Sequence, residues 1–578
     1  MRLIPTALAA ATALLSPSAI AQTAAAAPPA HPSTAQAKRP NILLIVADDL
    51  GWSDLGAFGG EIDTPNLDRL ALQGIRFTGW HTAPTCSPTR AMLMSGVDNH
   101  EAGLGTMAEM LTPNEVGQPG YEGYLNDRVA SIAELLRQGG YRTMMAGKWH
   151  LGLTPERSPA ARGFDRSFAL LQGLGNHFGA DQNAAWGKVE RATYREGLKE
   201  VPFPAGAYST DLFTGKLLGF LAEPRAGGQP FFAYLPFSAP HWPLMAPDVD
   251  IAKYKGRYDE GYEVLAAQRL AREKALGLVP ADATPHAMVG VKPWAQLTPQ
   301  ERADSARRME VYAAMVDHLD RAVGRVIDQL RASGDLDNTL IVFTADNGPE
   351  GGVIDGPRKA GVDPAAVAAL HIDNSVANIG HGTSYVGYGS GWAQANSAPS
   401  WLVKGYTTEG GIRTSAFISG AGVAGGRIVN SFVHITDVAP TLLAKAGLSE
   451  PASFGGHPIL PYEGHSLVPL IAGDAAPVHP ADELVAWELF DGRAIRRGNW
   501  KAVYLAPGSS RYLIERGNGQ WKLFDLARDP GENTDLAAQQ PAVLKELVAA
   551  WGRYAVAKGV VLPPADGATK PADRKQLP

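Results

Sequence analysis

The feature that most constrains the fold is an unbroken apolar run at residues 41–47 (NILLIVA), which stops abruptly at Asp48 and Asp49. So short a run suits a strand buried on both faces, as the strands of parallel sheets are. Similar runs follow at residues 142–146, 230–235 and 340–343. Helical patterns lie between them, at residues 129–136 and 309–330. Strands alternating with helices predict an α/β fold: a large, mostly parallel mixed sheet sandwiched by helices.

Polar residues follow each of these expected strands. The first strand ends in two aspartates, and the later ones lead to a lysine, histidines and an Asp-Asn pair: Lys148, His150, His241, Asp346 and Asn347. In open α/β sheets, binding sites form beyond the carboxyl ends of the strands. We therefore expect these side chains to share one site.

Four of these residues carry hard oxygen donors, namely Asp48, Asp49, Asp346 and Asn347. Such a set, with no thiolate, suits Ca²⁺ or Mg²⁺ rather than zinc. A single acidic pair at a strand end fits a helix cap or a turn equally well. Two such pairs, each ending a buried strand, favour a metal site.

The only cysteine, Cys86, begins the sequence CSPTR, which leads into a run of helix-forming residues. Pro88 near its start places Cys86 at or just before a helix N-terminus. There, free backbone N–H groups favour an anionic nucleophile or oxyanion, and Arg90 can point back to the same spot. The pentapeptide alone also fits a capping turn with a solvated arginine and an inert thiol.

The N-terminus is typical of an export signal. Arg2 precedes an Ala- and Leu-rich stretch, and residues 19–21 form an A-x-A cleavage signal. We predict a signal peptide at residues 1–21, a linker at 22–40, recognition by the secretion machinery, and a periplasmic or secreted protein. No apolar run is long enough to span a membrane. The net charge of −6 and the pI of about 6.2 argue against a nucleic-acid partner.

The pattern changes after about residue 450. Short strands are expected at residues 484–490, 494–504 and 521–526, and a helix at 542–554. This predicts a smaller C-terminal α+β domain with an antiparallel sheet. The large domain is placed at residues 41–450, the small one at 451–565 and a tail at 566–578.

The CSPTR segment resembles the Cys-x-Pro-x-Arg signature that sulfatases present to the formylglycine-generating machinery. Further segments resemble sulfatase motifs in family order: NILLIVADDLG at 41–51, AGKWHLG at 146–152, APHWP at 239–243, TADNG at 344–348, and Lys404 before EGGIR at 409–413. GNWK at 498–501 and LFDL at 523–526 also look typical. The chain is identified as a type I sulfatase of the alkaline-phosphatase-like superfamily. Residues 384–385 and 392–395 resemble bacterial aryl- and alkylsulfatases.

The resemblance implies that Cys86 is oxidised to 3-oxoalanine (formylglycine) by a formylglycine-generating enzyme. It also implies that residue 86, the three aspartates and Asn347 hold one Ca²⁺, with Mg²⁺ second in preference. Hydration of the aldehyde gives a geminal diol, of which one hydroxyl attacks sulfur to form a covalent sulfo-enzyme.

The remaining roles also follow from the resemblance. Lys148 and Lys404 neutralise the sulfuryl oxygens, and Arg90 orients the diol. His241 serves the leaving oxygen, and His150 takes a proton from the second hydroxyl to release sulfate. The implied reaction is hydrolysis of a small sulfate ester, aryl or alkyl, to an alcohol or phenol and inorganic sulfate.

Two other functions remain open. The first is hydrolysis of phosphate or phosphonate esters on the same fold, since the superfamily shares metal sites across chemistries. The second is a catalytically silent protein that binds sulfated ligands. The substrate is not identified; Trp80, His81, His100, His177 and Trp392 could line its pocket or serve in the core.

Overall fold

The computed structural model describes residues 39–189, 191–357, 363–507, 514–515 and 517–562. The predicted signal peptide (1–21), nearly all of the predicted linker (22–40) and the predicted tail (566–578) lie outside the described residues.

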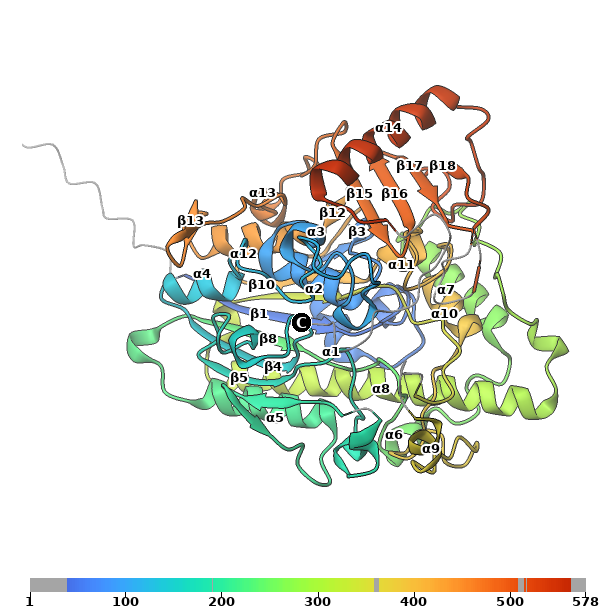
Figure 1. The fold of residues 1–578 in the computed structure, drawn as a ribbon, viewed down its shortest axis with the longest axis horizontal. Coiled ribbons are helices and arrows are strands. Elements are labelled where there is room, and N and C mark those ends of the chain that lie inside the picture. Colours follow the sequence, from blue (N-terminus) through green and yellow to red (C-terminus); the bar gives the residue numbers. More distant parts are fainter. Residues whose placement is uncertain (1–38, 190, 358–362, 508–513, 516, 563–578) are drawn as a thin grey trace, which may run out of the picture. The chain divides into compact units, whose positions relative to one another are not determined.

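A ten-stranded mixed sheet forms the centre of the described chain (Figure 1), and it confirms the predicted fold class. β9, β1, β8, β4 and β5 are neighbours and run parallel, whereas β10 pairs antiparallel with β9. The strands in sheet order are β11 (Arg427–Val429), β2 (Ile75–Phe77), β10 (Ala416–Gly420), β9 (Thr339–Ala345), β1 (Asn41–Ala47), β8 (Phe231–Pro236), β4 (Arg142–Lys148), β5 (Arg166–Leu170), β6 (Tyr194–Glu196) and β7 (Lys199–Val201).

The alternation of side chains along β1 explains the two helical layers. Ile42, Leu44 and Val46 enter one hydrophobic core, which they share with α2 (Cys86–Ser95), α4 (Ile132–Gln138) and α12 (Val438–Lys445). The residues between them enter the other core, beneath α1 (Pro65–Gln73), α5 (Ser209–Ala222) and α8 (Pro299–Ala332). A strand covered on both faces must be apolar at every position, as the sequence is.

Helix starts follow local capping signals. α8 begins ten residues before the predicted 309, because Thr298 caps it, Pro299 opens it and Glu301 closes a capping box. Ser131 and Glu134 start α4 in the same way. The other helices are α3 (Asn99–Ala102), α6 (Asp248–Lys253), α7 (Tyr262–Ala275), α9 (Pro364–Ala368), α10 (Ser390–Ser397), α11 (Glu409–Ile412), α13 (Val468–Ala472) and α14 (Pro541–Lys558).

The predicted C-terminal antiparallel sheet is present as β15 (Leu484–Leu489), β16 (Gly492–Arg497), β17 (Trp500–Tyr504) and β18 (Trp521–Asp525). The expected strand at 494–504 is in fact two strands, because Gly498, with φ of +57°, reverses the chain between them. One sheet face packs on α14 and the other joins the core beneath α8.

Two short strand pairs complete the secondary structure: β3 (Trp80–His81) with β12 (Val433–His434), and β13 (Ser453–Phe454) with β14 (His457–Pro458). Within the described residues, no helix is both long and apolar enough to cross a bilayer.

We predict that Leu44→Ala lowers the free energy of unfolding by about 2–5 kcal/mol, because it leaves a cavity in a filled core. Leu44 is fully buried in β1. Leu72→Ala is the matched control, since Leu72 is 50% exposed and its truncation leaves no cavity. Urea unfolding followed by circular dichroism measures both; equal effects would contradict the assigned core.

Candidate active site

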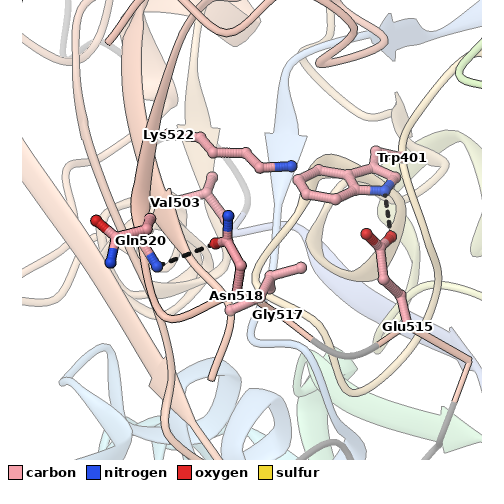
Figure 2. A pocket seen from close by; sticks show the side chains of 8 residues that line it. Trp401, Val503, Glu515, Gly517, Asn518, Gln520 and Lys522 are labelled. Carbon is pink, nitrogen blue, oxygen red and sulfur yellow. Dashed lines mark hydrogen bonds between the residues drawn. The ribbon is translucent and has the colours of Figure 1, made fainter. Parts of the chain in front are cut away.

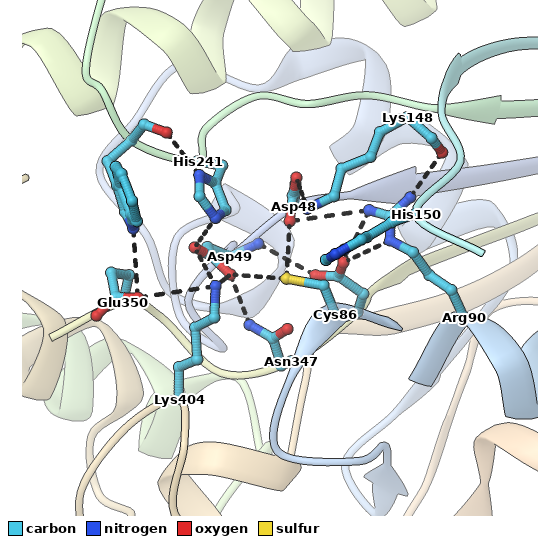
Figure 3. A network of polar contacts seen from close by, with 12 residues as sticks. Asp48, Asp49, Cys86, Arg90, Lys148, His150, His241, Asn347, Glu350 and Lys404 are labelled. Atoms are coloured by element: carbon cyan, nitrogen blue, oxygen red, sulfur yellow. Dashed lines mark hydrogen bonds and ion pairs between the residues drawn. The ribbon is translucent and has the colours of Figure 1, made fainter. Parts of the chain in front are cut away.

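The predicted strand-end residues converge on one buried cluster (Figure 3). Asp48 and Asp49 follow β1, Lys148 ends β4, and the neighbouring strands contribute His241 and the Asp346-Asn347 pair. Cys86 enters from the start of α2, and Lys404 from the loop between α10 and α11. Every one of these side chains is buried, and so are Arg90 and His150. The structure thus brings the predicted strand-end side chains into one shared cluster.

The aspartate pair takes its geometry from the end of β1. Asp49 has a φ of 65°, a left-handed conformation that Asp tolerates better than most residues. Its backbone N–H donates to Asp346 Oδ1 (3.2 Å), which ties the end of β1 to the end of β9. Asn347 Nδ2 donates to Asp49 Oδ1 (2.7 Å). Both acidic pairs therefore face the same space.

Cys86 is the first residue of α2, as expected, with Thr85 as its N-cap. Its Sγ atom lies 3.5 Å from Asp48 Oδ1 and 3.9 Å from Asp49 Oδ1. Burial raises the pKa of the Cys86 thiol well above its usual value, although the charges of Lys148 and Lys404 oppose this. The encoded thiol is therefore protonated at neutral pH and is a poor nucleophile in this setting.

The Arg90 side chain is buried and hydrogen-bonds to two other segments of the chain, so the alternative of a solvated arginine is wrong. Its Nε and Nη2 atoms donate to Asp346 Oδ2 (2.9 and 2.7 Å), and its Nη1 donates to the carbonyl oxygen of Lys148 (2.9 Å). This guanidinium joins α2 to the ends of β9 and β4. With Arg90 as the main opposing charge, the pKa of Asp346 falls below its usual value despite burial.

The two lysines each pair with one acid of the β1 end. Lys148 Nζ lies 2.7 Å from Asp48 Oδ2, and Lys404 Nζ lies 2.7 and 2.9 Å from the two Asp49 oxygens. Burial disfavours the ammonium of Lys148, but the surrounding negative groups, Asp48 foremost, together outweigh it and raise the lysine pKa. Burial also raises the pKa of Asp48 to about 7. Each of the three strand-end acids around Cys86 thus faces a cation.

The two histidines differ in their surroundings. His241 Nδ1 bonds the carbonyl oxygen of Trp242 (2.6 Å), and its Nε2 lies 3.5 Å from Asp49 Oδ2. Burial, aided by the charges of Lys404 and Lys148, lowers the pKa of His241 well below its usual value. His150 Nε2 lies 3.1 and 3.2 Å from the Glu109 carboxylate oxygens, and its buried Nδ1 has no hydrogen-bond partner among the described residues.

Sequence reasoning missed two acids of this site. Glu109, in the 3-10 turn Ala108–Met110, fixes the ring of His150. Glu350 lies 3.7 Å from Lys404 Nζ and accepts from Trp242 Nε1 (3.4 Å). Glu350 stands four residues after Asp346, so its place beside TADNG was a usable signal. Glu109 lies in a loop with no strand or motif near it, and nothing in the sequence pointed to it.

An aromatic group lies beside His241. The His241 and Trp242 ring centroids are 4.9 Å apart, and Trp242 lies 5.9 Å from Tyr385. Tyr385 in turn stacks on Trp186 at 5.7 Å. These side chains come from three separate loops next to the cluster. Trp186 and Tyr385 are buried in a small hydrophobic cluster, and Trp242 packs against it on the side where His241 lies.

The residues present fit a hard cation. Asp48, Asp49, Cys86 and His241 each offer a ligand atom, and these atoms lie within 4.8 Å of one another. Asn347 Oδ1 is buried and accepts no hydrogen bond within the described chain, so it has an unsatisfied lone pair beside Asp49. Three carboxylates and an amide oxygen are the donors that Ca²⁺ prefers.

Of the other residues proposed for a pocket, only His177 touches this cluster, through a hydrogen bond between its Nε2 and the His241 carbonyl (2.9 Å). Trp80 and Trp392 belong to the two hydrophobic cores. His81 pairs with Glu409 and His100 with Asp98, both inside the protein. A cavity of about 120 Å³ beside Trp401 and Lys522 (Figure 2) is lined by none of the predicted site residues.

The sheet order, the acid pairs at its strand ends and the buried Cys86 motif define a hydrolase of the alkaline-phosphatase-like fold. The sulfatase family model matches residues 40–448. The chain belongs to the sulfatase family, a family of sulfuric ester hydrolases.

The relatives agree over most of the chain. An uncharacterised sulfatase of Schizosaccharomyces pombe is 46% identical, covering 92% of this chain and 96% of the relative. An arylsulfatase of Klebsiella aerogenes is 40% identical, covering 75% of this chain and 92% of the relative. The crystal structure of Ps i-CgsB in complex with k-i-k-neocarrahexaose is similar with a TM-score of 0.65 and 25% identity, covering 92% of this chain and 97% of that chain.

We predict that Glu109→Gln lowers kcat roughly 10-fold, because Glu109 orients the ring of His150. A positioned general base contributes about 10²–10⁴-fold in all. Burial lowers the pKa of His150, and the Glu109 carboxylate opposes this shift. Removing that negative charge lowers the pKa of His150 further. Because the implied role of His150 is in sulfate release, after the alcohol has left, the acid limb of kcat, measured at saturating substrate, moves to lower pH.

The rate of 4-nitrophenyl sulfate hydrolysis between pH 5 and 9 measures this shift. The control is Glu156→Gln, because Glu156 is exposed and lies outside the cluster. An acid limb that stays in place, or moves to higher pH, would show that Glu109 does not act on His150.

Proposed function

We propose that this protein hydrolyses aryl or alkyl sulfate esters to an alcohol or phenol and inorganic sulfate, with residue 86 as the nucleophile. The observation that carries the proposal is the position of Cys86, which begins α2 within 3.5 Å of Asp48 and lies in a sulfatase signature. The 40% identical Klebsiella aerogenes arylsulfatase supports aryl sulfates as one class of substrate.

The nucleophile is proposed to be a formylglycine made from Cys86 by a formylglycine-generating enzyme. Support comes from the CSPTR motif and from the raised pKa of the buried thiol, which makes an unmodified cysteine unsuited to attack. The hydrated aldehyde supplies one hydroxyl that attacks sulfur, breaks the ester S–O bond and leaves a sulfo-enzyme. Its second hydroxyl then loses a proton, and C–O cleavage releases sulfate and restores the aldehyde.

The metal is proposed to be a single Ca²⁺ held by Asp48, Asp49, Asp346, Asn347 and residue 86. When bound, calcium supplies positive charge that polarises the sulfuryl oxygens and the attacking hydroxyl. Each of the three carboxylates is paired with Arg90 or a lysine, so a dication adds positive charge that favours an anionic ester.

The other side chains are proposed to act from where they lie. Lys148 and Lys404 hold the sulfuryl oxygens, and Arg90 holds residue 86 in line. For His241 to protonate or hydrogen-bond the leaving oxygen, its Nε2, which faces Asp49, must carry a proton in addition to the one that Nδ1 donates to the Trp242 carbonyl. His150 takes the proton of the second hydroxyl at Nδ1, the nitrogen left free because Glu109 occupies Nε2.

We further propose that the protein is exported to the periplasm or the medium. The support is the predicted signal peptide at residues 1–21, with its A-x-A site, which the secretion machinery would recognise.

We predict that Cys86→Ala abolishes turnover of 4-nitrophenyl sulfate and leaves the far-ultraviolet circular dichroism spectrum unchanged. The small side chain fits the buried site but offers no nucleophile. Cys86→Ser is the matched control: a serine can be sulfated, but it lacks the second hydroxyl that releases sulfate. It should give at most one turnover per chain.

Mass spectrometry of the peptide containing residue 86 completes this test. Active protein should carry an aldehyde, with one oxygen in place of the sulfur and two hydrogens of cysteine. Turnover by Cys86→Ala would refute the nucleophile. An unmodified thiol in active protein would refute formylglycine, and an unmodified thiol in inactive protein would favour a silent sulfate-binding protein.

We predict a higher kcat/KM for 4-nitrophenyl sulfate than for an aryl phosphonate monoester or an aryl phosphate. Membership of the sulfatase family and the 40% identical arylsulfatase favour sulfate over the phosphonate, which carries the same single charge. Charge distinguishes sulfate from phosphate, because a phosphate monoester is more negative than a sulfate ester at neutral pH. Steady-state rates on the same preparation of protein give the comparison. A higher kcat/KM for the phosphonate would contradict the proposed substrate and favour phosphonate hydrolysis instead.

A further inference from the structure

A second group of potential metal ligands lies where the main body meets the C-terminal sheet. His465 lies shortly before α13, and His479 and Glu483 lie between α13 and β15 (Figure 1). The Glu483 carboxylate sits between the two rings: His465 Nε2 is 3.1 Å from each of its oxygens, and His479 Nδ1 is 3.1 Å from Oε2. The three ligand atoms lie within 4.8 Å of one another.

These separations suit one small ion with short bonds. Donors about 2.0–2.2 Å from a tetrahedral zinc lie about 3.3 Å from one another. The two histidine–glutamate distances are already close to that value. The imidazole rings have centroids 4.7 Å apart and stand at 88° to each other, so they do not stack and both nitrogens can turn toward the carboxylate.

The surroundings hold His479 as a ligand. Asp437, fully buried, accepts from His479 Nε2 (2.8 Å), which directs Nδ1 toward Glu483. Carboxylate–histidine pairs of this kind orient metal ligands and raise their basicity. Asp437 is itself fixed by the backbone N–H groups of His434 and His465 (2.8 Å each). The same aspartate therefore positions both histidine segments.

The site also has an entrance. The His465 side chain is 42% exposed and that of Glu483 is 26% exposed, whereas His479 is buried. An ion can enter from that side and keep a water as its fourth ligand. In the turn formed by residues 480–483, Glu483 N–H donates to the Pro480 carbonyl oxygen (3.1 Å). This turn brings His479 and Glu483 together.

We propose that His465 Nε2, His479 Nδ1 and the Glu483 carboxylate bind a divalent transition metal, with Zn²⁺ as the best match. Two imidazoles and one carboxylate form a borderline donor set that favours zinc over calcium, unlike the oxygen-rich cluster at Cys86. This site goes beyond the proposed sulfatase activity. Its ligands come from two segments, one just before α13 and the other just before β15. Bound zinc therefore links these segments and stabilises the connection to the C-terminal sheet.

The test uses untagged full-length protein, kept in excess Ca²⁺ so that the oxygen-rich cluster is not available to zinc. The protein is incubated with micromolar free Zn²⁺ and passed through a desalting column, and bound zinc is counted by mass spectrometry. Wild type should retain one zinc per chain and show a higher melting temperature with zinc. His465→Gln should retain none, and its melting temperature should not respond to zinc.

His457→Gln is the matched control, because His457 is an exposed histidine on β14, outside the cluster. It should bind zinc like wild type. Asp437→Asn keeps all three ligands and should weaken zinc binding about 10–100-fold, measured by competition with a chromophoric chelator. Co²⁺ supplies a second readout, since its visible absorption is intense in four-coordinate sites and should vanish in His465→Gln.

Either of two results would overturn the proposal. One is a wild-type protein that retains no zinc. The other is equal zinc in wild type and in a folded His465→Gln variant, which would place the ion elsewhere. Because none of these measurements uses catalytic turnover, failure of the zinc site and failure of the proposed sulfatase mechanism are separable.

Discussion

The structure depends on the mutual neutralisation of charges at the end of β1. Asp48 and Asp49 are buried, and each is paired with a lysine from a different segment. A buried charge without a partner costs several kcal/mol. Removing either lysine would therefore penalise the fold as well as the chemistry. Arg90 extends the same network to Asp346 and so fixes the start of α2 against two strands. The site is thus part of what holds the sheet edge together.

The strand order gives this network its geometry. β9, β1, β8 and β4 are neighbours and parallel, so residues far apart in sequence end at one edge. Cys86 comes from a helix on one face of the sheet, and Lys404 from a loop that returns to the same edge. The negative charges are thus carried by rigid strand ends. The cysteine at a helix start lies among them with its thiol protonated.

Much of this arrangement could be predicted from the sequence. The strand predicted at residues 41–47 has the same bounds as β1, and its apolar character reflects the helices that cover both of its faces. The polar residues after each strand located the site, because parallel strands share an edge. Glu109 escaped prediction because its partnership with His150 depends on how a loop folds back. The hairpin at Gly498 was missed although the sequence offered a signal for it, since Gly498-Asn499 stands between two strand-like runs. Long-range loop contacts leave little local pattern.

The aromatic group beside His241 has a consequence for how such a protein can change. Trp186 and Tyr385 come from connecting segments, and Trp242 from the loop after β8, whereas the ionic cluster is built mainly on strand ends and a helix start. Replacing Trp186 or Tyr385 would alter the packing beside His241 and leave the pairs of Asp48, Asp49 and Asp346 with their cations in place. The packing beside His241 can therefore drift with the loops, while the charge network at Cys86 is held by the sheet.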